Sequence, residues 1–305
     1  MNIKLGFDLN CFGNRYMEPE AWTDVVASCG IHIIQFNFDV IDFLLPAKIQ
    51  KKLVEKTLAS CRKNNIRIKC AFGGHNHHQN YLGHPDDEAA KAYETFYRQM
   101  ADLTAGLGAE GFGTCFAILT VNANRDRKRR KEILLRAIES YHRLADYGKK
   151  LGLKYLLYET TSTPRETGAT FEENDWLLSR MKGSAIPMLL CLDVGHRNQE
   201  NPGAPEADPY AWIERYGKVS PLIHIQQSNN QGSFHWPFVP EYNNKGDVQP
   251  EKVLAALRRS EAKHEILLAL EIRHRAYYPE ECHLEHNLRE SVKYWRHWVK
   301  GRDVP

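Results

Sequence analysis

The chain has 305 residues, of which 42% are hydrophobic and 26% are charged, and its formal net charge is +3 at pH 7. These values are typical of a globular protein, and they give no electrostatic reason to expect binding to nucleic acid or to a membrane. No apolar run approaches the roughly 20 residues of a membrane-spanning helix, and the N-terminus does not resemble a signal peptide. The seven cysteines include no CxxC pair, so we expect free thiols and a cytoplasmic protein.

Short apolar runs alternate with segments of helical periodicity along the chain. We expect strands at 3–9, 32–38, 66–72, 111–119, 154–159, 187–193, 220–226 and 265–272. We expect helices near 18–29, 47–64, 86–107, 126–151, 171–182, 208–216, 250–262 and 279–299. Pro85 and the acidic residues 86–88 mark the start of one helix, and Gly152 marks the end of another.

This alternation predicts parallel βαβ units and therefore an α/β fold. Eight units favour a closed (β/α)8 TIM barrel over an open sheet, and no GxGxxG dinucleotide motif follows the first strand. Because no linker or repeat interrupts the pattern, we expect residues 1–305 to form a single domain. Long loops follow strands three, five, six and seven, at the end of a barrel where active sites are built.

Four consecutive strands carry a side chain that can bind a metal ion. These residues are Glu159, Asp193, His224 and Glu271, at spacings of 34, 31 and 47 residues. Such spacings correspond to one βα unit each, so all four side chains can reach the same barrel mouth. For each residue alone, a helix cap or a local salt bridge explains its position equally well. For all four together we favour one divalent metal ion, because three converging carboxylates repel each other without a cation. This ligand set suits Mn²⁺, Mg²⁺ or Co²⁺, with Zn²⁺ as a further candidate.

The order Glu, Asp-x-x-His, His, Glu on strands five to eight resembles the xylose-isomerase-like barrel superfamily. That superfamily includes ketose 3-epimerases, hydroxypyruvate isomerases and the endonuclease IV repair enzymes. The segment GDVQPEKVLAAL (246–257) is similar to the run that leads into helix seven of the epimerases. The motifs STPRET (162–167) and SFHWPF (233–238) further resemble a branch that acts on tetrulose phosphates in erythritol catabolism.

The resemblance implies an isomerase, and it implies the same four residues as the metal ligands. Glu159 and Glu271 would also serve as an acid/base pair, one on each face of a bound ketose or ketose phosphate, with a tetrulose phosphate favoured. A proton next to the carbonyl would be removed to give an ene-diolate and then returned. His196 would hydrogen-bond substrate oxygens, and Glu166 lies near the position of a substrate-contacting glutamate. Epimerisation and aldose–ketose isomerisation both stay open.

Other residues near the strand ends are candidates for contacts with the substrate. We expect His75, in the histidine-rich segment 73–84, to contact it and His235 to form a wall of its pocket. Arg165, Arg273 and His274 are candidates for binding a phosphate group. For the arginines, ordinary surface charge is an equally good interpretation.

Two further functions are kept as alternatives. A phosphodiesterase of the endonuclease IV type, acting on abasic DNA, needs two or three metal ions. Strand four lacks the histidine of the repair enzymes, however, and SFH (233–235) replaces their Asp-Arg-His. The basic run 124–132 is more typical of a solvated helix face than of a nucleic-acid site. A non-catalytic sugar-binding barrel would bind ketose without proton exchange.

We expect a small sugar or sugar phosphate as the partner, and neither nucleic acid nor a membrane. The segment YWRHWV (294–299) is expected to pack against the barrel or against a second subunit of a homo-oligomer.

Overall fold

A computed structural model describes residues 2–74, 78–198, 201–274 and 282–299. Its strands are β1 (Asn2–Asp8), β2 (Ile33–Asn37), β3 (Arg67–Phe72), β4 (Gly111–Cys115), β5 (Tyr155–Glu159), β6 (Met188–Asp193), β7 (Leu222–Ile225), β8 (Gln227–Asn229), β9 (Gly232–Trp236) and β10 (Glu265–Leu270). Its helices are α1 (Pro19–Ser28), α2 (Ala47–Lys63), α3 (Asp87–Gly106), α4 (Val121–Arg125), α5 (Arg127–Lys150), α6 (Phe171–Arg180), α7 (Pro209–Tyr216), α8 (Pro240–Asn243), α9 (Pro250–Arg259) and α10 (Leu284–Arg296).

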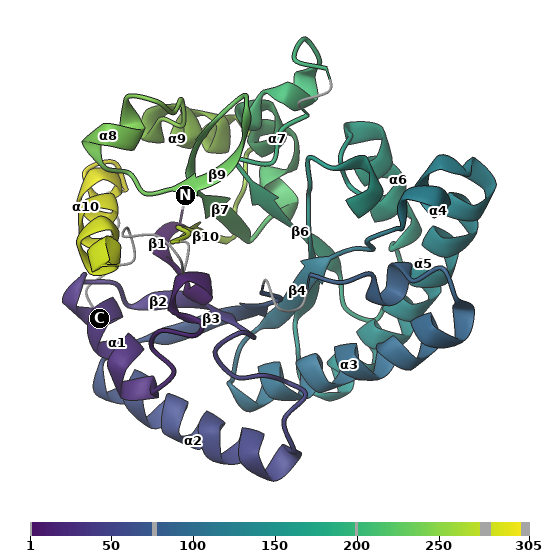
Figure 1. Ribbon diagram of the computed structural model, residues 1–305, viewed down its shortest axis with the longest axis horizontal. Coiled ribbons are helices and arrows are strands. Elements are labelled where there is room, and N and C mark those ends of the chain that lie inside the picture. Colours follow the sequence, from purple (N-terminus) through teal and green to yellow (C-terminus); the bar gives the residue numbers. More distant parts are fainter. Residues whose placement is uncertain (1, 75–77, 199–200, 275–281, 300–305) are drawn as a thin grey trace.

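Eight parallel strands close into a barrel in the order β1-β10-β7-β6-β5-β4-β3-β2, with the helices arranged around it (Figure 1). The fold is a (β/α)8 TIM barrel, which confirms the fold class expected from the alternation of apolar runs. The strands are apolar on both faces because one face lines the barrel interior and the other packs against helices. Cys70, Leu157 and Leu267 belong to the inner layer, whereas Ile34, Leu156 and Leu268 belong to the larger core under the helices.

The expected helix boundaries have the caps that the sequence indicates. The carboxylate of Asp86 accepts a hydrogen bond from the Ala89 amide at 2.8 Å and caps α3. Gly152, just after α5, adopts a φ of +83°, which favours glycine at the end of a helix. On the last helix, Trp295 is fully buried against Phe238, with ring centroids 5.3 Å apart, so this part of YWRHWV packs against the barrel.

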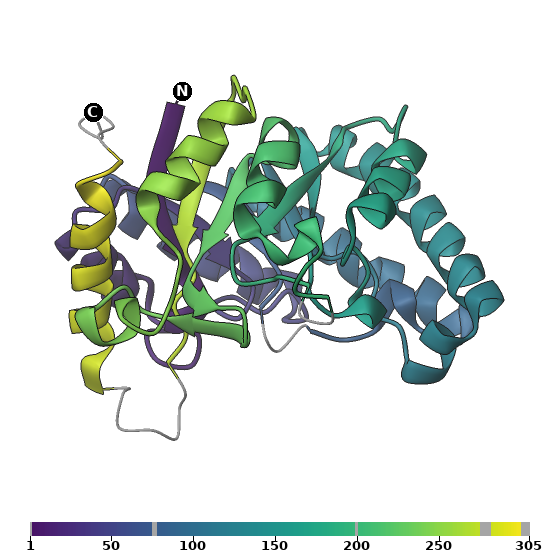
Figure 2. The ribbon, with the colours of Figure 1, turned by 90° about the horizontal axis from the view of Figure 1, so that it is seen from above.

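Two segments differ from the sequence-based expectation. The fourth strand ends at Cys115 and not at residue 119. The buried residues after Cys115 pack against the loop that follows β5, where the Leu119 amide donates a hydrogen bond to the Arg165 carbonyl at 2.7 Å. The segment 227–249, expected to be a loop, contains the antiparallel hairpin of β8 and β9 and the short helix α8. The chain's N-terminus and this hairpin lie at opposite ends of the barrel (Figure 2).

A cluster of ion pairs lies at the end of the barrel where the strands begin. The buried Lys69 ammonium lies 2.8 Å from Glu110 and 3.1 Å from Glu265. Lys154 also contacts Glu110, at 2.9 Å. Burial of Glu110 acts to raise its pKa, but the hydrogen bonds and charges of the two lysines lower that pKa to about 2.

We expect Glu110→Gln to lower the free energy of unfolding at pH 7 by about 1–2 kcal/mol, a value that allows for solvent screening of this partly exposed carboxylate. Because the folded-state pKa is depressed, the contribution is present above the unfolded-state value of about 4.5 and is lost as pH falls toward 2. Urea denaturation at pH 7 and pH 3 measures it. Glu214→Gln, in an exposed pair with Arg259, is the control and should change stability by less than about 0.5 kcal/mol. A difference at pH 3 as large as that at pH 7 would contradict this account.

None of the helices in the described ranges has the length and apolar character needed to cross a membrane. All seven cysteines are free, and Cys115 is one of the two that are not fully buried.

Candidate active site

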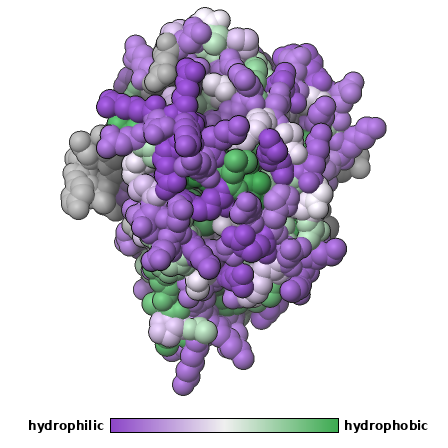
Figure 3. Space-filling model, turned by 90° about the vertical axis from the view of Figure 1, so that its right-hand side faces the viewer, coloured by the Kyte–Doolittle hydropathy of each residue, from purple (hydrophilic) through white to green (hydrophobic). Residues whose placement is uncertain are grey.

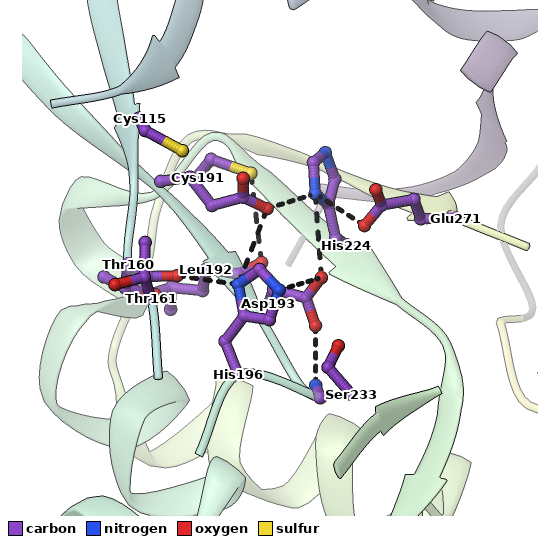
Figure 4. Close-up of polar contacts among 12 residues, drawn as sticks. Cys115, Thr160, Thr161, Cys191, Leu192, Asp193, His196, His224, Ser233 and Glu271 are labelled. Carbon is purple, nitrogen blue, oxygen red and sulfur yellow. Dashed lines mark hydrogen bonds and ion pairs between the residues drawn. The ribbon is translucent and has the colours of Figure 1, made fainter. Parts of the chain in front are cut away.

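Asp193, His224 and Glu271 meet at the end of the barrel where the strands finish (Figure 4), and Glu159 belongs to the same cluster. Glu159 and Asp193 are the last residues of β5 and β6, His224 lies on β7 in register with Asp193, and Glu271 directly follows β10. All four residues are buried. One potential ligand atom from each lies within 4.8 Å of the others. The structure therefore brings together the four residues that the strand spacing predicts.

The His224 ring contacts the carboxylates through its Nδ1 atom. This nitrogen lies 2.8 Å from Glu159 Oε1, 3.0 Å from Glu271 Oε2 and 3.9 Å from Asp193 Oδ2. A single proton on Nδ1 cannot serve three carboxylate oxygens, and the buried Glu271 Oε2 has no hydrogen-bond partner among the described residues. Three oxygen donors and one imidazole nitrogen fit a divalent cation of the Mn²⁺, Mg²⁺ or Co²⁺ type.

The Asp193 carboxylate is held by neutral donors in addition to the histidines. Its Oδ1 accepts hydrogen bonds from the Gly195 amide at 2.6 Å and from Gln226 Nε2 at 2.9 Å. Burial acts to raise the pKa of Asp193, but the nearby imidazoles of His196, His235 and His224 hold it well below its usual value. Asp193 is therefore ionised at every physiological pH and available as a ligand.

Glu271 has the opposite electrostatic character. Burial raises its pKa to about 8, although the nearby His224 opposes the shift. The Glu271 carboxyl group can therefore hold a proton near neutral pH, whereas the neighbouring Asp193 cannot. Strongly displaced pKa values of this kind are typical of functional sites, and they distinguish Glu271 from the permanently ionised Asp193.

His196 and His235 complete this side of the site. His196 Nδ1 donates a hydrogen bond to the Thr160 carbonyl at 3.0 Å, while Nε2 lies 3.8 Å from Asp193 Oδ2. Burial acts to lower the pKa of His196, but the surrounding carboxylates raise it to about 9. His235 adopts a φ of +53° in β9, and its Nδ1 lies 3.5 Å from Glu271 Oε2. Both imidazoles are therefore placed to donate hydrogen bonds to an oxygen-rich ligand.

A cavity of about 520 Å³ opens onto the cluster. It has a predominantly polar wall, and the predicted residues in that wall are Glu159, Glu166, His196, His235, Glu271 and Arg273. Glu166 also lies 3.3 Å from His78 Nε2. Burial acts to raise the pKa of Glu166, but the nearby His78 acts to lower it, and the net result is a pKa below the usual value. The volume suits a small sugar or sugar phosphate.

Two predicted contact residues, Arg165 and His274, are not among the residues that line the cavity. The Arg165 guanidinium donates to the Leu119 carbonyl at 3.3 Å. His274 is buried and its Nε2 lies 3.1 Å from the Asn287 side chain. His75 lies outside the described residues.

Several polar residues of the site were not predicted from the sequence. Gln226 contacts Asp193, Ser233 and His235, and therefore links β7 to the hairpin. Gln35 projects from β2 across the barrel interior to His224. A single glutamine inside an apolar strand carries no motif. The alternation of Phe234, His235 and Trp236 could have indicated the hairpin strand β9, because Phe234 and Trp236 stack at 4.1 Å on one face.

The basic run expected on the helix surface lies at the start of α5. The side of the molecule that carries α4, α5 and α6 is mostly hydrophilic, with a small hydrophobic hollow (Figure 3). Arg129 forms ion pairs with Asp87 and Glu132, and Arg130 forms one with Glu173. Acidic partners interrupt the positive charge, which favours a solvated helix face over a nucleic-acid surface.

Comparison with known proteins places this geometry in a family. The family model described as the xylose isomerase-like TIM barrel matches residues 23–298. The chain belongs to the xylose isomerase-like TIM-barrel family. Within this family, D-erythrulose 1-phosphate 3-epimerase of Brucella abortus (strain 2308) is 31% identical over 299 residues, which cover 97% of this chain and 96% of the relative.

Solved structures of the xylose isomerase-like type share the fold. A provisionally named xylose isomerase from Rhodospirillum rubrum superposes with a TM-score of 0.88 at 24% identity, covering 97% of this chain and 99% of the other. D-Psicose 3-epimerase from Clostridium cellulolyticum H10, solved with D-tagatose, has a TM-score of 0.70 at 14% identity, with 97% and 99% coverage. At these identities the likeness supports the barrel fold, whereas the site geometry rests on this chain's own residues.

Proposed function

We propose that the protein is a divalent-metal-dependent 3-epimerase of a ketose phosphate, with erythrulose 1-phosphate as the substrate. The observation that carries the proposal is the cluster of three carboxylates around His224 Nδ1 in a sugar-sized cavity. The 31% identity to a D-erythrulose 1-phosphate 3-epimerase over nearly the whole chain supports the substrate. In erythrulose 1-phosphate, C3 is the carbon that carries both a stereocentre and a proton next to the carbonyl.

In the proposed reaction, Glu159 and Glu271 move the proton. One carboxylate takes the C3 proton, the C–H electron pair forms the C2–C3 double bond of an enediolate, and the π pair of the carbonyl group moves onto the C2 oxygen. The other, protonated carboxyl group then gives a proton to the opposite face of C3, and the carbonyl group forms again at C2. When bound by Glu159, Asp193, His224 and Glu271, a divalent cation would supply Lewis-acid polarisation of the substrate oxygens. His196 and His235 would donate hydrogen bonds to those oxygens. Glu271 lines the cavity and can therefore reach C3 of a bound sugar.

The test uses Mg²⁺-loaded protein and enantiomerically pure erythrulose 1-phosphate. In D₂O the C3 proton signal should disappear from the NMR spectrum, and in H₂O the optical rotation should decay to zero, because the two C3 configurations are mirror images of equal free energy. New ketose signals from erythrulose 4-phosphate would instead show that the carbonyl group moves from C2 to C3; the phosphate ester at C1 excludes an aldehyde product. If protein that binds the metal leaves the C3 proton in place, the proposal fails.

Arg273 is the predicted phosphate-binding arginine that lines the cavity. We expect Arg273→Gln to raise KM for the ketose phosphate about tenfold and to change kcat little. A tenfold change corresponds to the loss of one charge-assisted hydrogen bond to the phosphate group. The kcat/KM for unphosphorylated erythrulose should stay unchanged. Arg165→Gln is the comparison, since Arg165 is not among the residues lining the cavity. Equal losses with both substrates would show that Arg273 does not bind the phosphate.

A further inference from the structure

The two ring nitrogens of His224 have different surroundings. Nδ1 faces the carboxylates of Glu159, Glu271 and Asp193. Nε2 points the other way and lies 2.6 Å from Oε1 of Gln35, which comes from β2 on another side of the barrel. Gln35 is fully buried.

We propose that Gln35 is a positioning residue that keeps the proton of His224 on Nε2 and thereby leaves Nδ1 free of a proton for the metal ion. This inference rests on the metal-dependent function proposed above. It assigns to Gln35 a role in metal affinity, without contact to the substrate.

A neutral imidazole carries one proton, on one of its two ring nitrogens. A ring nitrogen that binds a metal carries no proton, so the single proton of His224 must then be on Nε2. A buried N–H group without an acceptor costs free energy, and the Oε1 atom of Gln35 supplies the acceptor. An acceptor on the far nitrogen also fixes the ring orientation and increases the basicity of the ligating nitrogen. The imidazole ring and the Phe72 ring pack in a T-shaped arrangement, with centroids 5.4 Å apart at 75°, which further restricts rotation of the imidazole.

The rest of the Gln35 environment does not explain why an amide is there. Its Nε2 atom is buried and has no hydrogen-bond partner among the described residues. A buried amide with an unpaired N–H group is less favourable for stability than an apolar side chain of similar size. The opposite orientation of the amide would donate to His224 Nε2 and require the proton on Nδ1, where it would compete with the cation. The hydrogen bond from His224 Nε2–H to Gln35 Oε1 is therefore the interaction that accounts for this residue.

Gln35→Leu and Gln35→Glu separate this role from a structural one. Titration calorimetry of the full-length, metal-free proteins with Mn²⁺ should show a 10–100-fold loss of affinity in Gln35→Leu. Gln35→Glu keeps an acceptor oxygen at this position. It should therefore bind Mn²⁺ at least as tightly as the wild type, unlike Gln35→Leu. The melting temperature of metal-free Gln35→Leu should stay close to that of the wild type, because the unpaired amide N–H is removed while the acceptor for His224 Nε2–H is lost. Gln99→Leu, the same substitution on the distant helix α3, should leave Mn²⁺ affinity unchanged.

A second measurement reads the tautomer directly. In ¹⁵N NMR of histidine-labelled wild-type protein loaded with Mg²⁺, Nε2 of His224 should be protonated and its proton should exchange slowly with solvent. The same proton should exchange faster in Gln35→Leu. Wild-type affinity for Mn²⁺ in Gln35→Leu, or a proton on Nδ1 in the loaded wild type, would overturn the inference while leaving the proposed function intact. Absence of divalent-metal binding by the wild type would instead overturn the proposed function.

Discussion

Glu271→Gln is expected to lower kcat for epimerisation by about 10²- to 10⁴-fold, the usual contribution of a general acid or base. The amide is the same size as the carboxyl group and its oxygen can still face the cation. It cannot accept or return a proton at C3. The buried position that raises the pKa of Glu271 to about 8 is also the one that the substrate must approach, because this residue lines the cavity. Binding of metal and substrate should therefore change much less than turnover.

The measurement is the decay of optical rotation together with loss of the C3 proton signal in D₂O. Glu285→Gln removes a charge from a partly exposed residue that forms an ion pair with Arg289 and does not line the cavity, and it should leave both rates unchanged. Mn²⁺ affinity of Glu271→Gln, measured in parallel, separates a lost proton carrier from a lost ligand. Exchange at C3 within tenfold of the wild-type rate would rule out Glu271 as one of the two proton-transfer groups.

The barrel and its four-residue cluster follow from regularities that the sequence displays directly. Parallel strands in a closed barrel end at the same rim, so strand-end side chains one βα unit apart must converge. The approximate strand positions are enough to predict this convergence, and small errors at strand ends do not change it. Glu271 was expected inside the last strand but lies just beyond β10, and it still reaches His224.

The supporting residues depend on information that no local pattern contains. Gln35 reaches His224 because β2 and β7 are brought to face each other across the barrel interior, which is a property of the closed sheet. Arg165 and Arg273 have similar positions after their strands, yet only the latter lines the cavity, because the loop after β5 turns the Arg165 side chain toward Leu119. Polar residues in short hairpin strands such as β8 likewise lack the apolar periodicity on which strand prediction relies.

Asp193→Asn should remove the dependence of stability on the metal. At a free Mn²⁺ concentration 100 times the Kd, a site present only in the folded protein stabilises it by about 2.7 kcal/mol, which corresponds to roughly 4 °C in Tm for a chain of this length. An asparagine has one acceptor oxygen where the carboxylate has two. The Gly195 amide and Gln226 Nε2 donate hydrogen bonds to Oδ1 of Asp193, so the asparagine oxygen would take the Oδ1 place and its NH₂ group would face the cation. We therefore expect Mn²⁺ affinity to fall more than about 100-fold, beyond the range for loss of an indirect partner.

Differential scanning calorimetry with and without Mn²⁺ tests this expectation. Wild-type Tm should rise with Mn²⁺ and return to the metal-free value after chelation, whereas Asp193→Asn should melt at one temperature under all three conditions. Asp175→Asn, in an exposed ion pair with Arg215, should keep the wild-type response. Because three buried carboxylates then lose one negative charge, the metal-free Asp193→Asn protein gains from weaker repulsion while it loses an acceptor for buried N–H groups. These opposing terms make the change in Tm on adding metal, rather than Tm itself, the quantity that decides whether Asp193 is a ligand. An undiminished rise of Tm in Asp193→Asn would show that the cation is held elsewhere.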